Sequence, residues 1–170
     1  MAAMRSLSLI AAVIACAGLV ACAGTPKPSV ANARGTMKPY QVHGKWYVPR
    51  EDAHYDEVGI ASWYGPQHQG RPTADGEIFD MRKPSAAHKT LPLPSIVEVK
   101  NLENGRKIRV RVNDRGPFAQ GCIIDLSREA ADQLGFLQKG TAKVRVRYIG
   151  RADRTEADVE ARAYAEADDR

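Results

Sequence analysis

The chain has 170 residues, 44% hydrophobic and 26% charged, which is enough for one globular domain and too little for two of ordinary size. Its longest apolar stretch is Leu7 to Ala23, and later stretches are too short to cross a bilayer, which excludes a polytopic membrane protein. The net charge of +5 suits a polyanionic partner. Three cysteines without a C-x-x-C pair exclude a disulfide framework and a structural zinc site, so we expect a hydrophobic core, no metal and no cofactor.

Residues 1–21 have the pattern of a secretory signal peptide, in which Arg5 precedes an apolar run. The run ends in Leu19-Val20-Ala21-Cys22, which resembles the lipobox of bacterial lipoproteins. This resemblance implies that Cys22 is acylated and becomes the new amino terminus, anchored to the membrane. Ala23, where Asp would retain the protein, implies sorting to the outer membrane, facing the periplasm. The alternative is a plain signal peptide cut beside the cysteine.

Export also decides the class of polyanion that the protein meets. Without the +1 of Arg5 and the −3 of residues 151–170, residues 22–150 carry a formal charge of +7. An exported basic domain does not meet nucleic acid, so we expect it to act on the cell envelope. Cys122 is then the one cysteine left unmodified, and a buried thiol is favoured over a nucleophile because the sequence around it offers no base.

The segments outside the central region have few large apolar residues. Residues 22–39 are rich in Pro, Ala, Gly, Ser, Thr and Lys, which predicts a flexible tether. Residues 40–56 gather aromatic residues around a His43-Gly44 turn, and we expect an extended piece that packs on the domain. A platform for stacking sugars is the alternative. Residues 151–170 predict a charged, mobile tail.

The central region, residues 57–150, carries the strand patterns. Val97–Lys100 and Ile108–Val112 alternate apolar and charged residues around the Asn104-Gly105 dipeptide, which predicts a hairpin with one buried face. Lys143–Tyr148 repeats the alternation. Many short strands favour a mainly β fold, a compact barrel, over a parallel α/β sheet.

One or two short helices are inserted among these strands. Ser127 is a favourable N-cap, Glu129 lies in the first turn and Gly135 ends the pattern, which predicts a helix between them. We expect a shorter helix after Ser85. Asp125 and Ser127 are typical of a helix start and need no chemical role.

Four segments place functional groups in predicted loops. They are Gly59–Gly65, Thr73–Asp80, Ala86–His88 and Asn113–Pro117. In this order and spacing they resemble the RlpA (rare lipoprotein A) family of peptidoglycan lytic transglycosylases, from about Val58 to Tyr148. The matching patterns are S-W-Y-G, T-A-x-G-E-x-F-D, A-A-H-x-T-L-P, N-D-R-G-P and I-D-L-S.

The resemblance implies a six-stranded double-psi β-barrel over residues 57–150. It also implies cleavage of the β-1,4 bonds between MurNAc and GlcNAc in peptidoglycan glycan strands, with 1,6-anhydro-MurNAc ends. A preference for strands lacking stem peptides and a role in wall remodelling and daughter-cell separation follow as expectations. The alternative is a non-catalytic, expansin-like wall-binding lipoprotein. Residues 151–170 are too few for the SPOR domain that many members carry, so we expect none.

Glycosidic cleavage needs a carboxylic acid that protonates the leaving oxygen. Glu77, Asp80 and Asp114 supply carboxyls, and Asp114 is favoured because its N-D-R-G-P position resembles that of a catalytic aspartate in related barrels. Glu77 and Asp80 are expected to flank one groove, where their repulsion raises one pKa. We expect His88 to hold the proton or to orient a carboxylate.

The predicted substrate-binding residues are Trp63, Tyr64, Thr73, Gly76 and Arg115. Aromatic rings such as those of Trp63 and Tyr64 suit stacking on sugar faces. Taken without the family, acidic residues beside glycine are more often turn formers than catalysts, and Trp63 alone would be core. Family members usually carry Arg where this chain has Cys122, so we expect a groove cation to be missing.

Overall fold

The computed structural model describes residues 26–30 and 33–153. The predicted signal peptide and lipobox with Cys22, and most of the predicted tail, lie outside the described residues. Within the described ranges, no helix is long and apolar enough to span a membrane.

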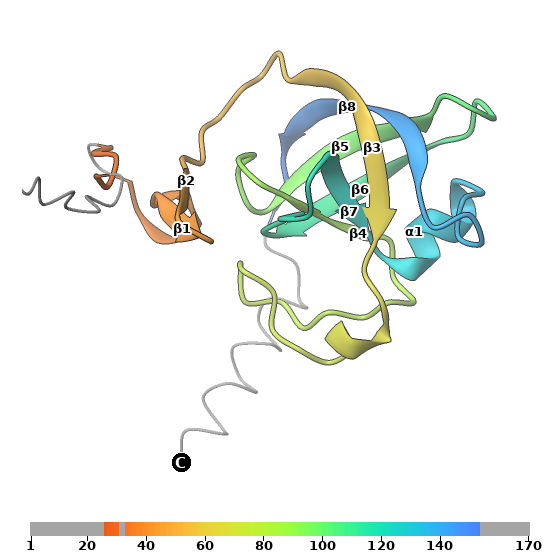
Figure 1. Cartoon of the computed structure of the whole chain (residues 1–170), viewed down its shortest axis with the longest axis horizontal. Helices are drawn as coiled ribbons and strands as arrows, with labels where there is room; N and C mark the ends of the chain where they lie inside the picture. The colour runs from red at the N-terminus through yellow and green to blue at the C-terminus, as the bar shows by residue number, and fades with distance from the viewer. Residues whose placement is uncertain (1–25, 31–32, 154–170) are drawn as a thin grey trace, which may run out of the picture.

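Six strands close into a barrel in the order β3, β7, β4, β6, β5 and β8 (Figure 1). β3 lies parallel to β7 and β4 parallel to β6, and the other neighbouring pairs are antiparallel. The strands are β3 (Asp56–Trp63), β4 (Ser85–His88), β5 (Ser95–Asn101), β6 (Lys107–Asp114), β7 (Cys122–Leu126) and β8 (Ala142–Arg151). The predicted fold class, a mainly β barrel of six strands, is confirmed.

The alternation of apolar and charged residues decides which side of each strand faces the core. Val97 and Val99 of β5 are fully buried, as are Val144 and Val146 of β8, while the charged residues between them lie outward. The predicted hairpin is confirmed, since β5 and β6 pair in antiparallel register. Gly105 in its turn has a φ of 77°, which favours glycine.

The helix predicted after Ser127 is confirmed as α1 (Arg128–Gln133). The Ser127 side chain accepts a hydrogen bond from the backbone N–H of Ala130. The helix predicted after Ser85 is wrong, because these residues form β4 and all four are buried. Alanine favours helices in isolation, but β6 and β7 pair with β4 on either side and impose an extended backbone.

A small hairpin precedes the barrel and lies against it. Its strands are β1 (Tyr40–Val42) and β2 (Lys45–Tyr47), preceded by a short 3-10 helix, η1 (Gly35–Met37). A second 3-10 helix, η2 (Pro66–His68), follows β3. The hydroxyl of Tyr40 donates to the carbonyl of Lys89 over 2.7 Å, and Thr36 donates to that of Leu93 over 3.3 Å. The end of the predicted tether therefore lies on the barrel.

Candidate active site

The loop of residues 73–77 is bound along the end of β6. The N–H of Asp75 donates to the carbonyl of Asn113 over 3.2 Å, and the N–H of Ala74 donates to Oδ1 of Asp114 over 2.9 Å. Thr73, one of the predicted binding residues, is buried and donates to Oδ1 of Asp75 over 2.8 Å. Gly76 has a φ of 96°, which lets the loop turn so that Glu77 points back at β6. The loop thus brings two carboxyls to the end of β6, beside Asp114.

Asp114, the favoured candidate for the acid, has one carboxyl oxygen held and one open. Its Oδ1 accepts from the N–H of Ala74 and from that of Arg115, the latter over 2.7 Å, and no partner binds Oδ2 among the described residues. Burial raises the pKa of Asp114, against the lowering effect of these two backbone donors and of the nearby charges of His68 and Arg115. The neighbouring cation, Arg115, therefore does not determine the direction in which the pKa of Asp114 shifts.

Glu77 is held by two side chains of β6. Nε of Arg111 donates to Oε1 over 2.6 Å, and Nδ2 of Asn113 donates to Oε2 over 2.7 Å. Glu77 and Asn113 are both buried. Because both carboxylate oxygens are engaged, this side chain is built into the wall of the site as an anion.

Asp75 is the electrostatic neighbour of Glu77, and the sequence analysis gave it no role. Burial raises the pKa of Asp75 to about 6, the charge of Glu77 adds to the rise, and the hydrogen bond from Thr73 opposes it. Its Oδ2 is buried without a partner, as is Oδ1 of Asn113. Asp75 therefore lies where a carboxylate is unfavourable.

Asp80 does not form the expected repulsive pair with Glu77. Its carboxylate accepts from the side chain of Arg82, with Nε 3.1 Å from Oδ1, and from Gln69 over 3.3 Å. These hydrogen bonds lower the pKa of Asp80, and the bond from Arg82 makes the largest contribution. The expectation was wrong because Arg82, two residues further on, neutralises Asp80, while Asp75 takes the place beside Glu77.

Asp125 is a third carboxyl with a raised pKa, again because of burial. It lies on β7 next to Ser62 of β3, whose hydroxyl donates to Oδ1 of Asp125. The nearby charges of Lys89 and His68 oppose the rise of its pKa. The sequence analysis missed Asp125 because it resembles a helix-start residue. The available signal was the alternation in β7, where Ile124 and Leu126 are buried on the other side of the strand.

Tyr64 lies among these carboxyls. The charges of Asp114, Asp125 and Glu77 all add to the burial that raises the pKa of its hydroxyl. Its ring packs on Phe79, with centroids 4.4 Å apart, and edge-on to His68 at 5.7 Å. Trp63 ends β3 and packs partly against the core. We define the carboxyl cluster as Asp75, Glu77, Asp114 and Asp125, and Tyr64 is the aromatic side chain that adjoins it.

His88 is buried on β4 and lies outside the carboxyl cluster. Its Nδ1 accepts from the N–H groups of Thr90 and Leu91, over 3.2 and 3.0 Å, so Nε2 carries the proton and donates to the hydroxyl of Tyr55 over 2.9 Å. Tyr55 in turn donates to Glu57. Burial lowers the pKa of His88 to about 3, with the charges of Arg115 and Lys89 adding to the effect. The ring is neutral and its two nitrogens are engaged, and its catalytic role stays a prediction.

The guanidinium of Arg115 binds backbone carbonyls rather than the carboxylate of its neighbour Asp114. Its guanidinium donates to the carbonyls of His88, Leu91 and Thr36, over 3.2, 2.6 and 2.8 Å. It also lies over the ring of Tyr40, 5.8 Å from the centroid. Arg115 therefore fastens η1 and the hairpin to the barrel, and its contact with substrate stays a prediction.

Cys122 is partly exposed rather than buried, because it is the first residue of β7. A cation is present beside it, contrary to the expectation from its replacement of Arg. The ammonium of Lys89 donates to the carbonyl of Cys122 over 2.6 Å. The positive charge comes from the loop after β4 instead of from β7.

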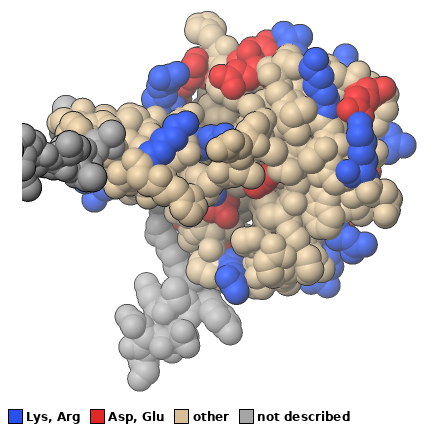
Figure 2. All heavy atoms as spheres, viewed as in Figure 1, with Lys and Arg blue, Asp and Glu red and all other residues tan. Residues whose placement is uncertain are grey.

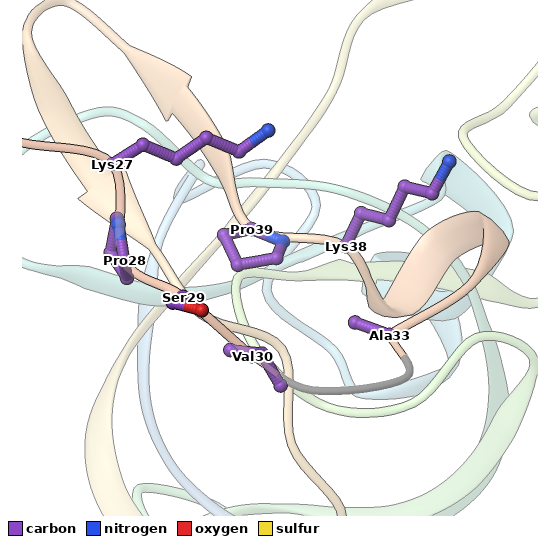
Figure 3. A pocket seen from close by; sticks show the side chains of 7 residues that line it. All are labelled: Lys27, Pro28, Ser29, Val30, Ala33, Lys38 and Pro39. Atoms are coloured by element: carbon purple, nitrogen blue, oxygen red, sulfur yellow. The ribbon is translucent and has the colours of Figure 1, made fainter.

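Figure 2 shows acidic atoms recessed near the centre of this face, between the N-terminal segment and the barrel. A separate hollow of about 350 Å³ is lined by Lys27–Val30, Ala33, Lys38 and Pro39 (Figure 3). It is lined by none of the predicted site residues. Among the residues that the structure describes, no three His, Cys, Asp or Glu side chains are grouped so that they could hold a metal ion.

Comparison with protein families gives a match over residues 56–146 to the family described as "Lytic transglycolase". Several curated relatives carry the name "Endolytic peptidoglycan transglycosylase RlpA". The one from Campylobacter jejuni is 50% identical over 124 residues, which cover 72% of this chain and 45% of the relative. One from Pseudomonas aeruginosa is 52% identical over 123 residues, covering 72% of this chain and 36% of the relative. The chain thus spans less than half the length of these relatives.

Solved structures give more distant similarities. The Streptomyces papain inhibitor has a TM-score of 0.49 at 25% identity, covering 59% of this chain and 99% of that one. A Clavibacter michiganensis expansin in complex with cellohexaose has a TM-score of 0.44 at 17% identity, covering 59% of this chain and 52% of that one.

Proposed function

The chain belongs to the lytic transglycolase family of double-psi β-barrels, and on that premise we propose that it is a peptidoglycan lytic transglycosylase with Asp114 as its acid. The observation that carries the assignment is the environment of Asp114. Its Oδ1 is fixed by two backbone donors, its Oδ2 is open, and burial raises its pKa. Such a carboxyl is oriented and can keep a proton that it donates outward.

The other two predicted acids are less suited to this role. Asp80 has a lowered pKa because of Arg82. Glu77 is held by Arg111 and Asn113 through both oxygens. A fixed anion suits stabilisation of the positive charge that develops at the anomeric carbon better than it suits proton donation.

In the proposed reaction, Oδ2 of Asp114 gives its proton to the glycosidic oxygen while the bond from this oxygen to C1 of MurNAc breaks. The 6-hydroxyl oxygen of the same MurNAc then bonds to C1, and its proton passes to the Asp114 carboxylate. The product has a 1,6-anhydro end, no water is consumed, and Asp114 regains its proton. We expect the ring of Tyr64, beside the cluster, to pack on a sugar.

Digestion of purified sacculi by the full-length chain and its Asp114→Asn variant tests this proposal. We expect the wild type to release fragments with 1,6-anhydro-MurNAc ends, identified by mass spectrometry, and the variant to release almost none. Binding to sacculi without any released product would instead make the protein a wall-binding module.

Strands without stem peptides are the proposed preferred substrate. Running the same digestion on intact and amidase-stripped sacculi tests the preference. We expect faster release from the stripped material, and equal rates would remove the preference while leaving the activity in place.

We further propose that the protein is an outer-membrane lipoprotein facing the periplasm, acylated at Cys22, and that it acts in wall remodelling and cell separation. The support is the apolar run that ends in Leu19-Val20-Ala21-Cys22. Mass spectrometry of the mature amino terminus tests the anchor. A diacylglyceryl cysteine is expected, and an unmodified peptide that begins at Ala23 would contradict it.

A further inference from the structure

The β1–β2 hairpin and the loop after Pro117 enclose a second cavity, of about 430 Å³. Its nine lining residues include Lys45, Tyr47, Lys89 and Phe118. Two of them are lysines and none is acidic. The cavity is therefore positively charged and has aromatic walls.

The aromatic walls are held in place by ring contacts. Tyr40 and Tyr47 stack with centroids 5.3 Å apart, and Phe118 meets Tyr47 edge-on at 5.5 Å. Phe118 is 37% exposed, so part of its ring is open to a ligand. The hairpin is held on the barrel, because the Tyr40 hydroxyl donates to the carbonyl of Lys89 and because Arg115 binds η1, directly before it, through the carbonyl of Thr36.

The two lysines are placed by different means. The ammonium of Lys89 is fixed by one hydrogen bond, which it donates to the carbonyl of Cys122. An ammonium has three protons, so two remain for other acceptors. The ammonium of Lys45 lies 5.5 Å from the centroid of the Tyr47 ring and is otherwise exposed. Both can therefore bind an anion that enters the cavity.

The cavity adjoins the carboxyl cluster. The backbone runs from Asp114 through residues 115–117 directly to Phe118. Asp114 is close enough to Tyr40 to contribute to the raised pKa of that hydroxyl, and Lys89 is close enough to Asp125 to oppose the rise of its pKa. A polymer bound at Asp114 can thus reach the cavity with a neighbouring unit.

We propose that this cavity is a subsite for a carboxylate-bearing unit of the glycan strand, a proposal that rests on the proposed function. Aromatic rings pack on the C–H face of a sugar, and the ammonium groups of Lys45 and Lys89 bind its carboxylate. Two parts of peptidoglycan carry such a group: the lactyl substituent of MurNAc in a bare strand, and the stem peptide in an intact one.

Calorimetric titration of the full-length Asp114→Asn variant, which binds without cleaving, tests this subsite. The ligands are a bare tetrasaccharide of alternating GlcNAc and MurNAc, the same tetrasaccharide with stem peptides, and chitotetraose, which has no carboxylate. Adding Lys45→Met should weaken binding of at least one carboxylated ligand about 5- to 10-fold and leave chitotetraose unchanged. Weaker binding of the bare tetrasaccharide would identify the lactyl carboxylate as the group bound in the cavity. Weaker binding of the peptide-bearing tetrasaccharide alone would identify a carboxylate of the stem peptide.

The matched control is Lys107→Met, which removes the same charge at the other end of β6 and should change no affinity. Phe118→Ala should weaken all three ligands, because a stacking face is lost. An unchanged affinity of the carboxylated ligands in Lys45→Met, or an equal loss for chitotetraose, would overturn the subsite. The sacculus digestion is independent of these titrations. If the wild type cleaves sacculi but Lys45→Met leaves every affinity unchanged, the subsite is rejected and the proposed function stands.

Discussion

The backbone N–H of Ala74 donates to Oδ1 of Asp114 over 2.9 Å, although forty positions of sequence separate the two residues. This bond joins the loop of residues 73–77 to the end of β6 and fixes the plane of the Asp114 carboxyl. The open oxygen, Oδ2, is consequently aimed by the backbone of a different segment. The orientation of the proposed acid depends on loop geometry as well as on its own strand.

Asp114→Asn should reduce release of 1,6-anhydro ends about 10²- to 10⁴-fold, because the amide has no acidic proton to donate. The amide oxygen still accepts from Ala74 and Arg115, so the melting temperature should change little. The control is Asp56→Asn, which loses an exposed bond to Arg145 and should retain nearly full activity. Retention of more than a tenth of the activity by Asp114→Asn would reject it as the acid.

Asp75→Asn should stabilise the protein at pH 7 and not at pH 4. The folded-state pKa of Asp75 is raised from 3.8 to about 6, so the folded state binds the proton more tightly than the unfolded state does. The resulting stability is present below pH 4 and is lost as the pH rises from about 4 to 6. The shift would correspond to about 3 kcal/mol if fully expressed, and partial exposure reduces this to about 1 kcal/mol.

Urea unfolding of the wild type and Asp75→Asn at pH 4, 5, 6 and 7 measures this difference. The free energy of unfolding of the variant should exceed that of the wild type by an amount that grows with pH. A difference independent of pH would show that Asp75 does not titrate in this range.

His88→Ala should cost about 2–4 kcal/mol at pH 7, because two backbone N–H groups and the Tyr55 hydroxyl lose a buried partner. The folded-state pKa of His88 is lowered from 6.5 to about 3, so its contribution is present above pH 6.5 and is lost as the pH falls toward 3. The difference in the free energy of unfolding between wild type and variant, measured with urea, should therefore become smaller as the pH falls toward 3. A 100-fold loss of activity in fully folded His88→Ala would instead support the predicted catalytic role.

Arg115→Lys should loosen η1 and the β1–β2 hairpin. One ammonium cannot reach the three carbonyls that the guanidinium binds, at His88, Leu91 and Thr36. We expect faster hydrogen exchange of backbone amides in residues 35–47, measured by mass spectrometry. Arg145→Lys, at an exposed ion pair, is the control, and equal exchange in all three proteins would contradict the anchoring role of Arg115.

The strands and α1 could be predicted because their signals are local. Alternation in β5, β6 and β8 and the cap at Ser127 depend on residues within a few positions of each other. β4 was missed because its alanines favour a helix until β6 and β7 pair with it.

The site could be predicted only in part, for the same reason. The motifs identify Glu77 and Asp114 as candidate residues, but the hydrogen bonds of the site carboxyls depend on partners distant in sequence. Arg111 lies 34 positions from Glu77, and Ser62 lies 63 positions from Asp125. Asp80 resembles these carboxyls in the sequence and differs because its partner, Arg82, is local.

Closure of the barrel also affects how copies of this protein behave when they are crowded. Each of the six barrel strands has a hydrogen-bonded neighbour on both sides, so the barrel offers no free edge to a strand of another molecule. Within the described part of the chain, β1 and β2 form the one sheet with open edges, and each has only three residues. Such short edges are poor templates for association, so the described part of the chain offers little to strand-to-strand aggregation when copies are crowded.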